Sequence, residues 1–575
     1  MNTNTNLYVS IDFGTCHTVI SYIDNVDFKI NHILDNITGD VLIPTTIYFD
    51  IQEEKMVHEL EYNKDFFIGN DANEMYNQKK EPLYFYQFKR FLGITSKSSE
   101  NHINFVKKFD QEFVTDEDLI YFYLKTQKEE KNIKIKISII ELIKLFFIGL
   151  GVLIRDRLNI SPETEINVAI TIPAYFHDLQ RTQLKRAVED AKYNNNGFKI
   201  FKIFNEPTAA SIYYIKNYYK ECDSNKKFII YDLGGGTIDT TVVEYHYEDN
   251  TCEILDISGN SSLGGIDIDN LLINNIYTKY NIDTKNNKIK NKIRKCAEEI
   301  KIKLSFNTTH SVVLEDVPII KNGEIYIKEN LKIEYTRHFF NNLINELIEE
   351  MIKSIIEMNK KYETNNIIFI GGPTQIPLLQ NKVYSILGIN DNILISNSGN
   401  IINNTSNTLL YKTIVADGAC LMYNLISIKN DIILLDIIPM NIGISDDNNK
   451  MIKMINKNSK IPLSCENIFT TSHDCQRTID INIYEGLEND CSKNNFIGSY
   501  KIVGIPPLPK GKILIKLIFH ISLNGILNIS INGLKNPYDD ETQKLDYKLC
   551  EKIKLISNYM AKDILKKLLI AKITK

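Results

Sequence analysis

Two aspartates in this chain each stand near the end of an apolar strand, two residues before a glycine. Asp12 lies in YVSIDFGTCHTVIS, residues 8–21, and Asp232 lies in FIIYDLGGGTIDTTVV, residues 228–243. In both segments small residues follow, and a second apolar strand resumes. Glycine lets backbone N–H groups approach an anion without a Cβ in the way, so each segment can cradle a phosphate beside a metal-holding carboxylate. The repeated pattern predicts two lobes that grip one nucleotide.

A third glycine turn follows another apolar strand. Residues 365–377 read NNIIFIGGPTQIP, and a long amphipathic stretch at 338–361 precedes them. The turn at Gly371 and Gly372 opens a helix, whose N-terminal N–H groups favour anions. This turn is therefore a further candidate for nucleotide contact.

The elements that position these turns alternate between strand and helix from about residue 7 to 430. INVAITIP at 166–173 is followed by a polar helix at 178–193, and FKIFKIF at 198–204 is followed by another helix. Such alternation is typical of a mixed α/β architecture. The next segment, DIILLD at 431–436, has four apolar residues between two aspartates and is interpreted as a hydrophobic linker.

The chain changes character after residue 437, where short alternating strands begin. ILIKLIFHISLNGILNISING at 513–533 alternates apolar and polar residues on both sides of Asn524-Gly525, a two-residue hairpin turn. This pattern predicts a separate β domain. Beyond it, apolar residues recur every three or four positions, which predicts an amphipathic helix of about 30 residues. They are Leu545, Leu549, Ile553, Ile556, Met560, Ile564 and Leu568.

The bulk composition excludes several classes of protein. The chain has 575 residues, 43% hydrophobic and 24% charged, and its net charge of −5 gives no reason to expect nucleic acid. The N-terminus has no secretory pattern, and the apolar run at 139–154 is too short and too charged to span a membrane. Nine scattered cysteines without a close pair fit a reducing compartment. We therefore expect a cytoplasmic protein without a membrane or nucleic-acid partner.

Several segments together resemble the heat shock protein 70 (DnaK-type) molecular chaperones. They are the two Asp-Gly hairpins, IPAYFHDLQR at 172–181, NEPTAA at 205–210, YDLGGGTID at 231–239 and the DIILLD linker. The similarity runs in order from about residue 7 to 533. It implies an α/β actin-like ATPase domain of duplicated ribonuclease H-like halves at 1–428, a linker at 429–436, a β-sandwich peptide-binding domain at 437–535 and a shortened helical lid at 536–575.

The resemblance also implies which residues act on the nucleotide. Asp12, Asp232 and Asp239 are the expected carboxylates around Mg²⁺, and Lys89 of FKRFLG is expected to orient the attacking water. The expected catalytic residues are Asp12, Lys89, Glu206, Asp232 and Thr237. Phosphate contacts fall on Gly14, Thr15, Cys16, His17, Gly234, Gly235 and Gly236. The adenosine side falls on Glu298, Lys301, Ser305, Gly371, Gly372, Pro373 and Gln375.

Some of these positions depart from the family pattern. The family usually has a second threonine where this chain has Cys16, and His17 is either a neutral packed histidine or a phosphate contact. Pro373 replaces a serine and has no N–H to donate, and Gln375 replaces the arginine that stacks on adenine. We predict weaker nucleotide affinity from these replacements.

The resemblance places a peptide pocket in the β domain. Its expected apolar lining is Ile444, Phe469, Ile479 and Ile481. The family closes an arch over the peptide with an apolar residue that here is Asp447, facing Ser472. Because an aspartate cannot cover a peptide without losing hydration of its charge, we predict weaker enclosure. The shortened lid predicts faster peptide exchange.

The leading hypothesis is an ATP-dependent chaperone that binds apolar segments of unfolded proteins. It implies ATP/ADP and Mg²⁺ as cofactors, with K⁺ as a further candidate ion, and a J-domain co-chaperone and a nucleotide exchange factor as partners. Pro173, Arg181 and the linker match the family's relay between nucleotide and peptide. One alternative is a nucleotide-binding regulatory relative with little hydrolysis. Another is an actin-fold small-molecule kinase, which the linker and the β domain argue against.

Overall fold

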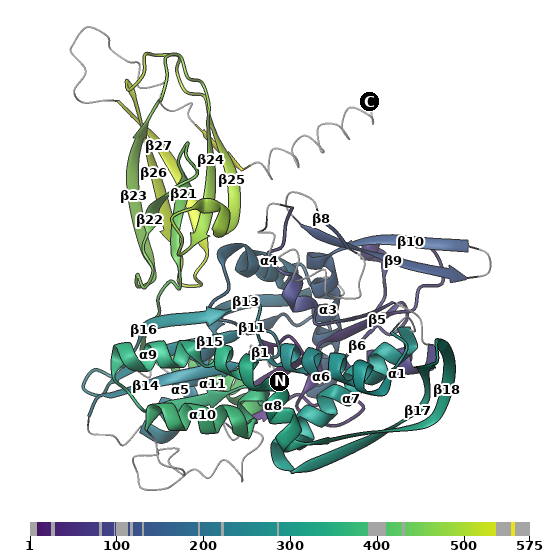
Figure 1. The fold of residues 1–575 in the computed structure, drawn as a ribbon. Coiled ribbons are helices and arrows are strands. Elements are labelled where there is room, and N and C mark those ends of the chain that lie inside the picture. Colours follow the sequence, from purple (N-terminus) through teal and green to yellow (C-terminus); the bar gives the residue numbers. More distant parts are fainter. Residues whose placement is uncertain are drawn as a thin grey trace.

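Two lobes lie side by side, and a β sandwich stands on them (Figure 1). This computed structural model describes residues 8–24, 29–79, 83–96, 98, 113–115, 119–128, 131–193, 196–219, 224–284, 287–388, 410–427, 432–535 and 554–557. The first lobe surrounds the sheet that contains β1, and the second surrounds the sheet that contains β14.

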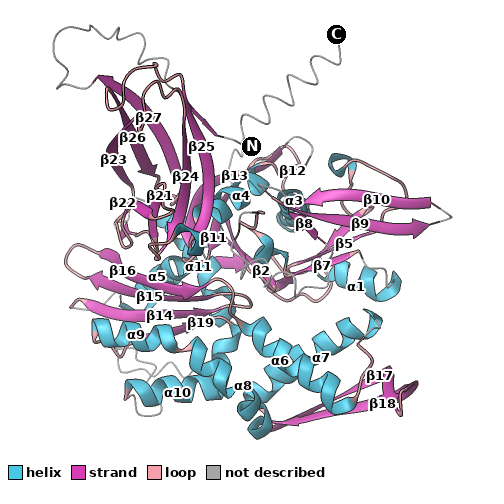
Figure 2. Ribbon diagram, turned by 45° about the horizontal axis from the view of Figure 1, so that its top comes forward, coloured by secondary structure: helices cyan, strands magenta, loops and turns pink. Residues whose placement is uncertain are grey.

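The first lobe is built on a mixed sheet of order β12-β13-β11-β1-β2-β3, with β4 paired to β2. Its central strand, β1, runs parallel to β11 and antiparallel to β2. The strands are β1 Tyr8–Phe13, β2 His17–Ile23, β3 Ile30–His32, β4 Ile43–Pro44, β11 Ile166–Ile172, β12 Lys192–Tyr193 and β13 Asn196–Asn205. The central strands are mostly apolar because helices cover the sheet (Figure 2).

Helix α3, Ile139–Leu158, fills the core of the first lobe. It begins at a capping box in which the Ser138 hydroxyl accepts from the Glu141 N–H and the Glu141 carboxylate accepts from the Ser138 N–H. Most of its apolar residues are buried. The lobe also contains β5 Thr46–Phe49, β6 Phe66–Ile68, α1 Gly69–Lys79, β7 Tyr84–Tyr86, β8 Phe113–Thr115, β9 Ile120–Lys128, β10 Lys131–Ser138 and α4 Asp178–Glu189.

The second lobe repeats the pairing of the first. Its sheet has the order β19-β14-β15-β16-β20, and β14 runs antiparallel to β15 and parallel to β19. The strands are β14 Lys226–Leu233, β15 Ile238–His246, β16 Thr251–Asn260, β19 Ile367–Ile370 and β20 Ile433–Leu435. In both Asp-Gly segments the predicted second strand is present and pairs antiparallel with the first, inside a larger sheet.

Helices and a long ribbon complete the second lobe. The ribbon pairs β17 with β18 and lies along the outer edge in Figure 1. The amphipathic stretch near 338–361 forms two helices, α8 and α9, which Ile352 separates. The elements are α6 Gly265–Tyr280, α7 Asn287–Phe306, β17 Thr309–Lys321, β18 Glu324–Thr336, α8 Arg337–Met351, α9 Lys353–Tyr362, a 3₁₀ turn Gly372–Gln375 and α10 Pro377–Leu387. Between the lobes lie α5 Glu206–Tyr214 with its π-helical continuation Ile215–Tyr219, and α11 Leu410–Ser427.

The predicted linker adds a strand to the second lobe. Strand β20 runs parallel to β16, with Cys252 opposite Leu434. Ile432 and Leu434 pack against the apolar cluster between the lobes. The linker is therefore docked on the second lobe in this structure.

The β domain is a sandwich of two sheets around a core of isoleucine, leucine and phenylalanine. The sheets have the orders β22-β21-β24-β25-β28 and β23-β26-β27. The hairpin predicted at Asn524-Gly525 joins β26 to β27, and Gly525 has a positive φ of 68°. The strands are β21 Asn441–Ser445, β22 Met451–Ile455, β23 Leu463–Thr470, β24 Ile479–Gly486, β25 Asn495–Val503, β26 Ile513–Ile521, β27 Leu527–Lys535 and β28 Lys554–Ser557.

The prediction of an unbroken helical lid is wrong at residues 554–557. These residues form β28, which pairs antiparallel with Tyr500–Val503 of β25. The open edge of β25 offers backbone hydrogen bonds, and such pairing overrides an apolar spacing that fits either a helix or a strand. The other stripe residues, from Leu545 to Leu568 apart from Ile556, lie outside the described residues.

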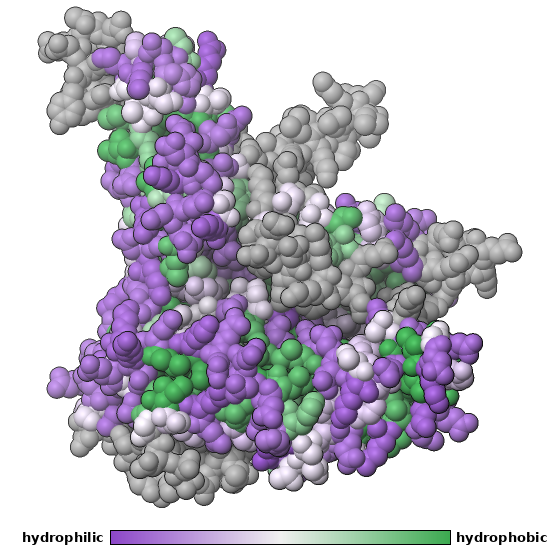
Figure 3. All heavy atoms as spheres, in the orientation of Figure 1, coloured by the Kyte–Doolittle hydropathy of each residue, from purple (hydrophilic) through white to green (hydrophobic). Residues whose placement is uncertain are grey.

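In the view of Figure 3, apolar side chains form separate patches among hydrophilic ones over the described surface. Within the described ranges, no helix is long and apolar enough to cross a membrane.

Candidate functional site

The two glycine turns meet at the base of the cleft. A Cβ added to Gly235 would lie 2.6 Å from Cys16 Sγ, and one added to Gly236 would lie 3.1 Å from Thr15 Oγ1. The first turn is itself tight, since a Cβ on Gly14 would lie 2.3 Å from the His17 carbonyl oxygen. The structure thus brings the two predicted phosphate turns together, with small residues where their backbones approach.

Four acidic side chains surround one lysine behind these turns. Lys89 Nζ lies 3.1 Å from Glu206 Oε1, and both side chains are nearly buried. Asp12 Oδ1 accepts from the Thr171 hydroxyl at 2.9 Å. We call Asp12, Lys89, Glu206, Asp232 and Asp239 the acidic cluster. Its members come from both hairpins, from the start of α5 and from the 3₁₀ turn Phe88–Phe91.

The acidic cluster carries more negative charge than its lysine can offset. Burial first and Glu206 second raise the pKa of Asp12 to about 7 and that of Asp239 to about 7. The same two causes raise the pKa of Asp232 well above its usual range. These carboxyls are costly to ionise unless a cation lies among them.

A hydrated divalent cation fits this cluster. Asp239 Oδ1 accepts from the Tyr175 N–H at 2.9 Å, whereas its buried Oδ2 has no hydrogen-bond partner among the described residues. Those residues also place no three acidic, histidine or cysteine side chains closely enough to bind one metal ion directly. Oxygen ligands with intervening waters are the usual setting of Mg²⁺. The cluster therefore suits an ion held largely through water.

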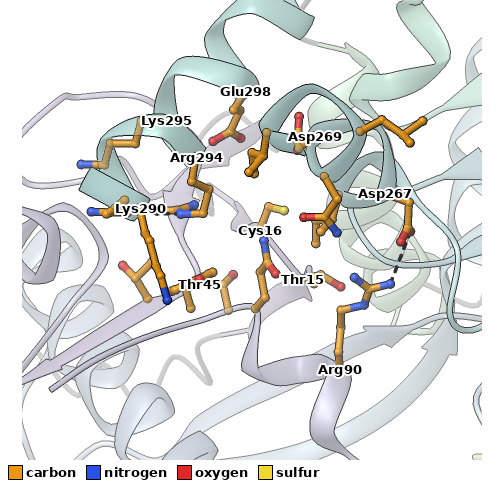
Figure 4. A pocket seen from close by; sticks show the side chains of 18 of the residues that line it. Thr15, Cys16, Thr45, Arg90, Asp267, Asp269, Lys290, Arg294, Lys295 and Glu298 are labelled. Carbon is orange, nitrogen blue, oxygen red and sulfur yellow. Dashed lines mark hydrogen bonds and ion pairs between the residues drawn. The ribbon is translucent and has the colours of Figure 1, made fainter. Parts of the chain in front are cut away.

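A cleft of about 1130 Å³ opens above the turns (Figure 4). Of the predicted nucleotide contacts, Thr15, Cys16, His17 and Glu298 line it. Burial raises the pKa of the Cys16 thiol to about 12, so this side chain is a neutral thiol. Burial lowers the pKa of His17, which favours the neutral imidazole whether it packs or touches a ligand.

The remaining adenosine-side residues lie beside the cleft. Lys301 Nζ donates to Asp269 Oδ2 at 2.7 Å, and both side chains are buried. Ser305 donates its hydroxyl to the Lys301 carbonyl within the helix. Burial opposes ionisation of Glu298, but Lys301, His17 and Arg294 outweigh it and lower its pKa. The predicted face of α7, with Glu298, Lys301 and Ser305, therefore places charged side chains beside the cleft.

The strand-to-helix turn after β19 packs under the second hairpin. A Cβ on Gly371, whose φ is 86°, would lie 2.1 Å from the Leu233 carbonyl oxygen. The Pro373 ring approaches Gly265, where an added Cβ would lie 2.6 Å from Pro373 Cγ. Gly372 and Gln375 belong to the 3₁₀ turn that follows. This third turn is near the second phosphate turn but not among the residues that line the cleft.

Sequence reasoning missed several residues that shape the cleft. Arg90 NH2 lies 3.5 Å from Asp267 Oδ2, the contact drawn in Figure 4. The Arg294 guanidinium lies 4.3 Å from the ring centre of Tyr86 and so bridges the two lobes. Arg90 directly follows Lys89, and Arg294 is one helical turn before Glu298, so their spacing could have identified both.

The predicted peptide pocket falls inside the sandwich. Ile444 and Ile481 are buried in its core, and Phe469 and Ile479 pack against that core with partial exposure. Asp447 and Ser472 are exposed on turns. Ser472 donates its N–H to Gln476 Oε1 at 2.8 Å, and no hydrogen bond joins it to Asp447 in the described part of the chain.

The sandwich is attached to both lobes through polar contacts. The first lobe contacts the sandwich where Asp178 donates its N–H to Glu485 at 2.9 Å. Arg181, predicted as a relay residue, lies in the same helix and donates within the first lobe to the carbonyls of Phe176 and Ala174 at 2.9 and 3.1 Å. Asp436, at the end of the linker, accepts from the Asn205 amide at 3.0 Å. Asp256 of the second lobe lies 3.1 Å from Lys457 Nζ of the sandwich. Linker, lobes and sandwich thus form one connected assembly here.

Comparison with known proteins gives a consistent match. The family model described as Hsp70 protein matches residues 8–552. The chain is 29% identical over 543 residues to the "Chaperone protein DnaK" of Ureaplasma urealyticum, covering 92% of this chain and 77% of that protein. It is 28% identical to the "Chaperone protein dnaK" of Thalassiosira pseudonana, over 91% and 80% of the two chains. It is 27% identical to "Heat shock 70 kDa protein 7, chloroplastic" of Arabidopsis thaliana, over 91% and 67%.

Proposed function

Because the chain belongs to the heat shock protein 70 family, we propose that it hydrolyses ATP between its two lobes and thereby controls peptide binding in its β sandwich. The protein is an ATP-dependent molecular chaperone for apolar segments of unfolded proteins. Members of its family are ATPases that bind ATP or ADP with Mg²⁺, and the DnaK-type members act on unfolded peptides with co-chaperones. The regulatory alternative with little hydrolysis is not favoured.

The single observation that carries the hydrolysis proposal is the acidic cluster beneath the paired glycine turns. Phosphoryl transfer needs a cation to offset charge, donors around the phosphates and a positioned water. In our proposal Asp12, Asp232 and Asp239 hold the hydration shell of Mg²⁺, and this ion supplies the charge that stabilises the transferred group. Lys89, fixed by Glu206 at 3.1 Å, holds the attacking water.

The turns supply the phosphate donors in this proposal. The backbone N–H groups of Thr15, Cys16 and the Gly234–Thr237 turn would face the phosphates, and Thr237 would stand beside the transferred group. Cys16 serves through its backbone, because its buried thiol stays neutral. On the adenosine side Glu298, Lys301 and Ser305 would contact the nucleoside, with Gly371, Gly372, Pro373 and Gln375 on the opposite turn. Pro373 has no N–H to donate, so we retain the prediction of weaker affinity.

The domain boundaries follow the same proposal. The ATPase domain occupies 1–428, the linker 429–436, and the peptide-binding sandwich 437–535. Residues 536–575 would cover the peptide, although β28 shows that 554–557 pair with the sandwich as a strand. A J-domain protein, a nucleotide exchange factor and a role for K⁺ are further expectations carried over from the family. A cytoplasmic location remains an expectation from the composition of the chain.

Single-turnover ATP hydrolysis tests the proposal. Lys89→Ala removes the group that holds the water and should lower the rate about 10²- to 10³-fold, the usual loss of one preorganised polar group in an active site. Lys64→Ala is the matched control, because Lys64 lies on the surface of the same lobe in an exposed pair with Glu61. Equal rates in the two variants would contradict the assignment.

A further inference from the structure

The contact between the sandwich and the first lobe contains a carboxyl that no cation pairs with in the described part of the chain. Glu485, on β24, is buried. Its Oε2 accepts from the Asp178 N–H, at the start of α4, at 2.9 Å. Asp178 Oδ1 in turn accepts from the Leu527 N–H of the sandwich at 2.7 Å. Each side of the interface thus presents one carboxyl to a backbone N–H of the other, and of the two Glu485 is the buried one.

The groups that face Glu485 make its ionisation costly. Asp178 repels a second negative charge, and Tyr175 lies close enough that an ionised Glu485 would raise its pKa further. Arg181 is the nearby cation, and its charge lowers the pKa of Glu485, but less than burial raises it. Its hydrogen bonds go to the carbonyls of Phe176 and Ala174 rather than to Glu485. On the sandwich side, the neighbours opposite Glu485 are Ile442 on β21 and Asn495 on β25, neither of which titrates.

We propose that Glu485 makes docking of the sandwich proton-dependent, so that it is a neutral carboxyl in the docked assembly and an ionised carboxylate when the sandwich separates. A neutral carboxyl still accepts the Asp178 N–H through its carbonyl oxygen, without placing a second charge beside Asp178. Separation returns the side chain to water, where it releases the proton. The docked and separated states therefore differ by one bound proton at this position.

The titration behaviour agrees with this geometry. Burial, followed by the charge of Asp178, raises the pKa of Glu485 to about 8 in the docked structure. Burial also raises the pKa of Asp178, to about 6, which leaves Asp178 ionised near neutral pH. Because Glu485 has a higher pKa docked than separated, docking is favoured at low pH and weakens as the pH rises through 8.

The ion pairs between the second lobe and the sandwich respond in a different pH range. Asp256 with Lys457, and Glu253 with Lys460, join the second lobe to the sandwich. A hydrogen bond from Lys460 lowers the pKa of Glu253. Burial opposes ionisation of Asp256, but its lysine and asparagine contacts outweigh burial and lower its pKa. Both carboxyls therefore stay ionised, and their pairing is constant over the window in which Glu485 titrates.

Infrared difference spectroscopy of the intact chain tests the protonation directly. The wild-type spectrum minus that of Glu485→Gln should contain a protonated carboxyl band at pH 7 that disappears with a midpoint near pH 8. The glutamine keeps the accepting carbonyl oxygen but cannot titrate. The matched control is Glu488→Gln, since Glu488 lies exposed three residues later in the same sandwich. Its subtraction should lack the band that the Glu485→Gln subtraction contains.

The second measurement is the docking constant of the sandwich as a function of pH. The chain contains no tryptophan, so Ile526→Trp, at a residue that packs against the first lobe, gives a single reporter of docking. With a non-hydrolysable ATP analogue at saturation, the docking constant should fall about 20-fold from pH 6.5 to 8.5, and Glu485→Gln should remove that fall. An ionised Glu485 at pH 7, or the same pH slope in Glu485→Gln as in the parent, would overturn the proposal.

Discussion

Carboxyl groups meet beside one cationic side chain at two places in this molecule. One is the acidic cluster between the lobes, and the other is the pair of Glu485 and Asp178 where the sandwich contacts the first lobe. In the acidic cluster Lys89 pairs directly with Glu206, yet three further carboxyls remain, and one of them has a buried oxygen without a partner among the described residues. Among the described residues under the sandwich, two carboxyls meet, and a backbone N–H group donates to each. The first arrangement suits a metal ion, whereas the second suits a single proton. The number of carboxyls and the room around them decide which cation a buried acid takes.

The largest effect is expected when a carboxylate of the acidic cluster is removed. Asp232→Asn removes one charge that holds the ion and should lower single-turnover ATP hydrolysis about 10²- to 10³-fold. Asp249→Asn, on an exposed turn of the same lobe, should leave the rate unchanged. If Asp232→Asn hydrolysed ATP at the parental rate, the cluster would not hold the catalytic ion.

Magnesium binding at the acidic cluster and docking of the sandwich should depend on pH in opposite directions. In the absence of an ion, Asp12 and Asp239 each have a pKa of about 7. Protons therefore compete with the metal, and release of both carboxyl protons should raise Mg²⁺ affinity about 30-fold between pH 6 and 7, with a plateau above about pH 8. The docking equilibrium should move in the opposite direction, weakening as the pH rises. Calorimetric titration with Mg²⁺ at several pH values measures the first slope, and an affinity that does not change with pH would contradict it.

A smaller effect is expected where lysines, rather than a metal or a proton, hold a buried acid. Asp256 accepts from Lys361 within the second lobe and from Lys457 and Asn458 of the sandwich. Asp256→Asn should weaken docking only about three- to tenfold, because these lysines are partly exposed and screened by water. Tryptophan emission from the Ile526→Trp reporter, combined with Asp256→Asn, measures the change. A loss larger than that caused by undocking the linker would show that this pair, and not the linker, dominates the interface.

Much of the site was predictable because its residues are close in sequence. Each hairpin is indicated by a strand, a carboxylate and small residues within one short segment, at Asp12 and Gly14 in the first and at Asp232 and Gly234 in the second. The repeated pairing of β1 with β2 and of β14 with β15 follows from that pattern. Local patterns succeed here because strand pairing and turn chemistry are set by neighbouring residues.

Contacts between distant segments were not predictable in the same way. Nothing around Glu485 in the sequence indicates that Asp178, 307 positions away, donates its N–H to it. The lid prediction failed at Ile556 because its apolar spacing fits a helix, whereas the open edge of β25 selects a strand. The acidic cluster could thus be predicted from the sequence, whereas the contact between Glu485 and Asp178 could be found only from the fold.

ATP hydrolysis at the acidic cluster and peptide binding in the sandwich are proposed to be coupled through the linker. Leu434 packs against the apolar cluster between the lobes, and Leu435 pairs with Glu253 of β16. The most direct test is the ATP hydrolysis rate with and without an apolar peptide, in the intact chain and in a Leu434→Asp, Leu435→Asp double variant. Peptide should raise the rate of the intact chain and should have no effect on the variant. An unchanged stimulation in the variant, or none in the intact chain, would contradict it.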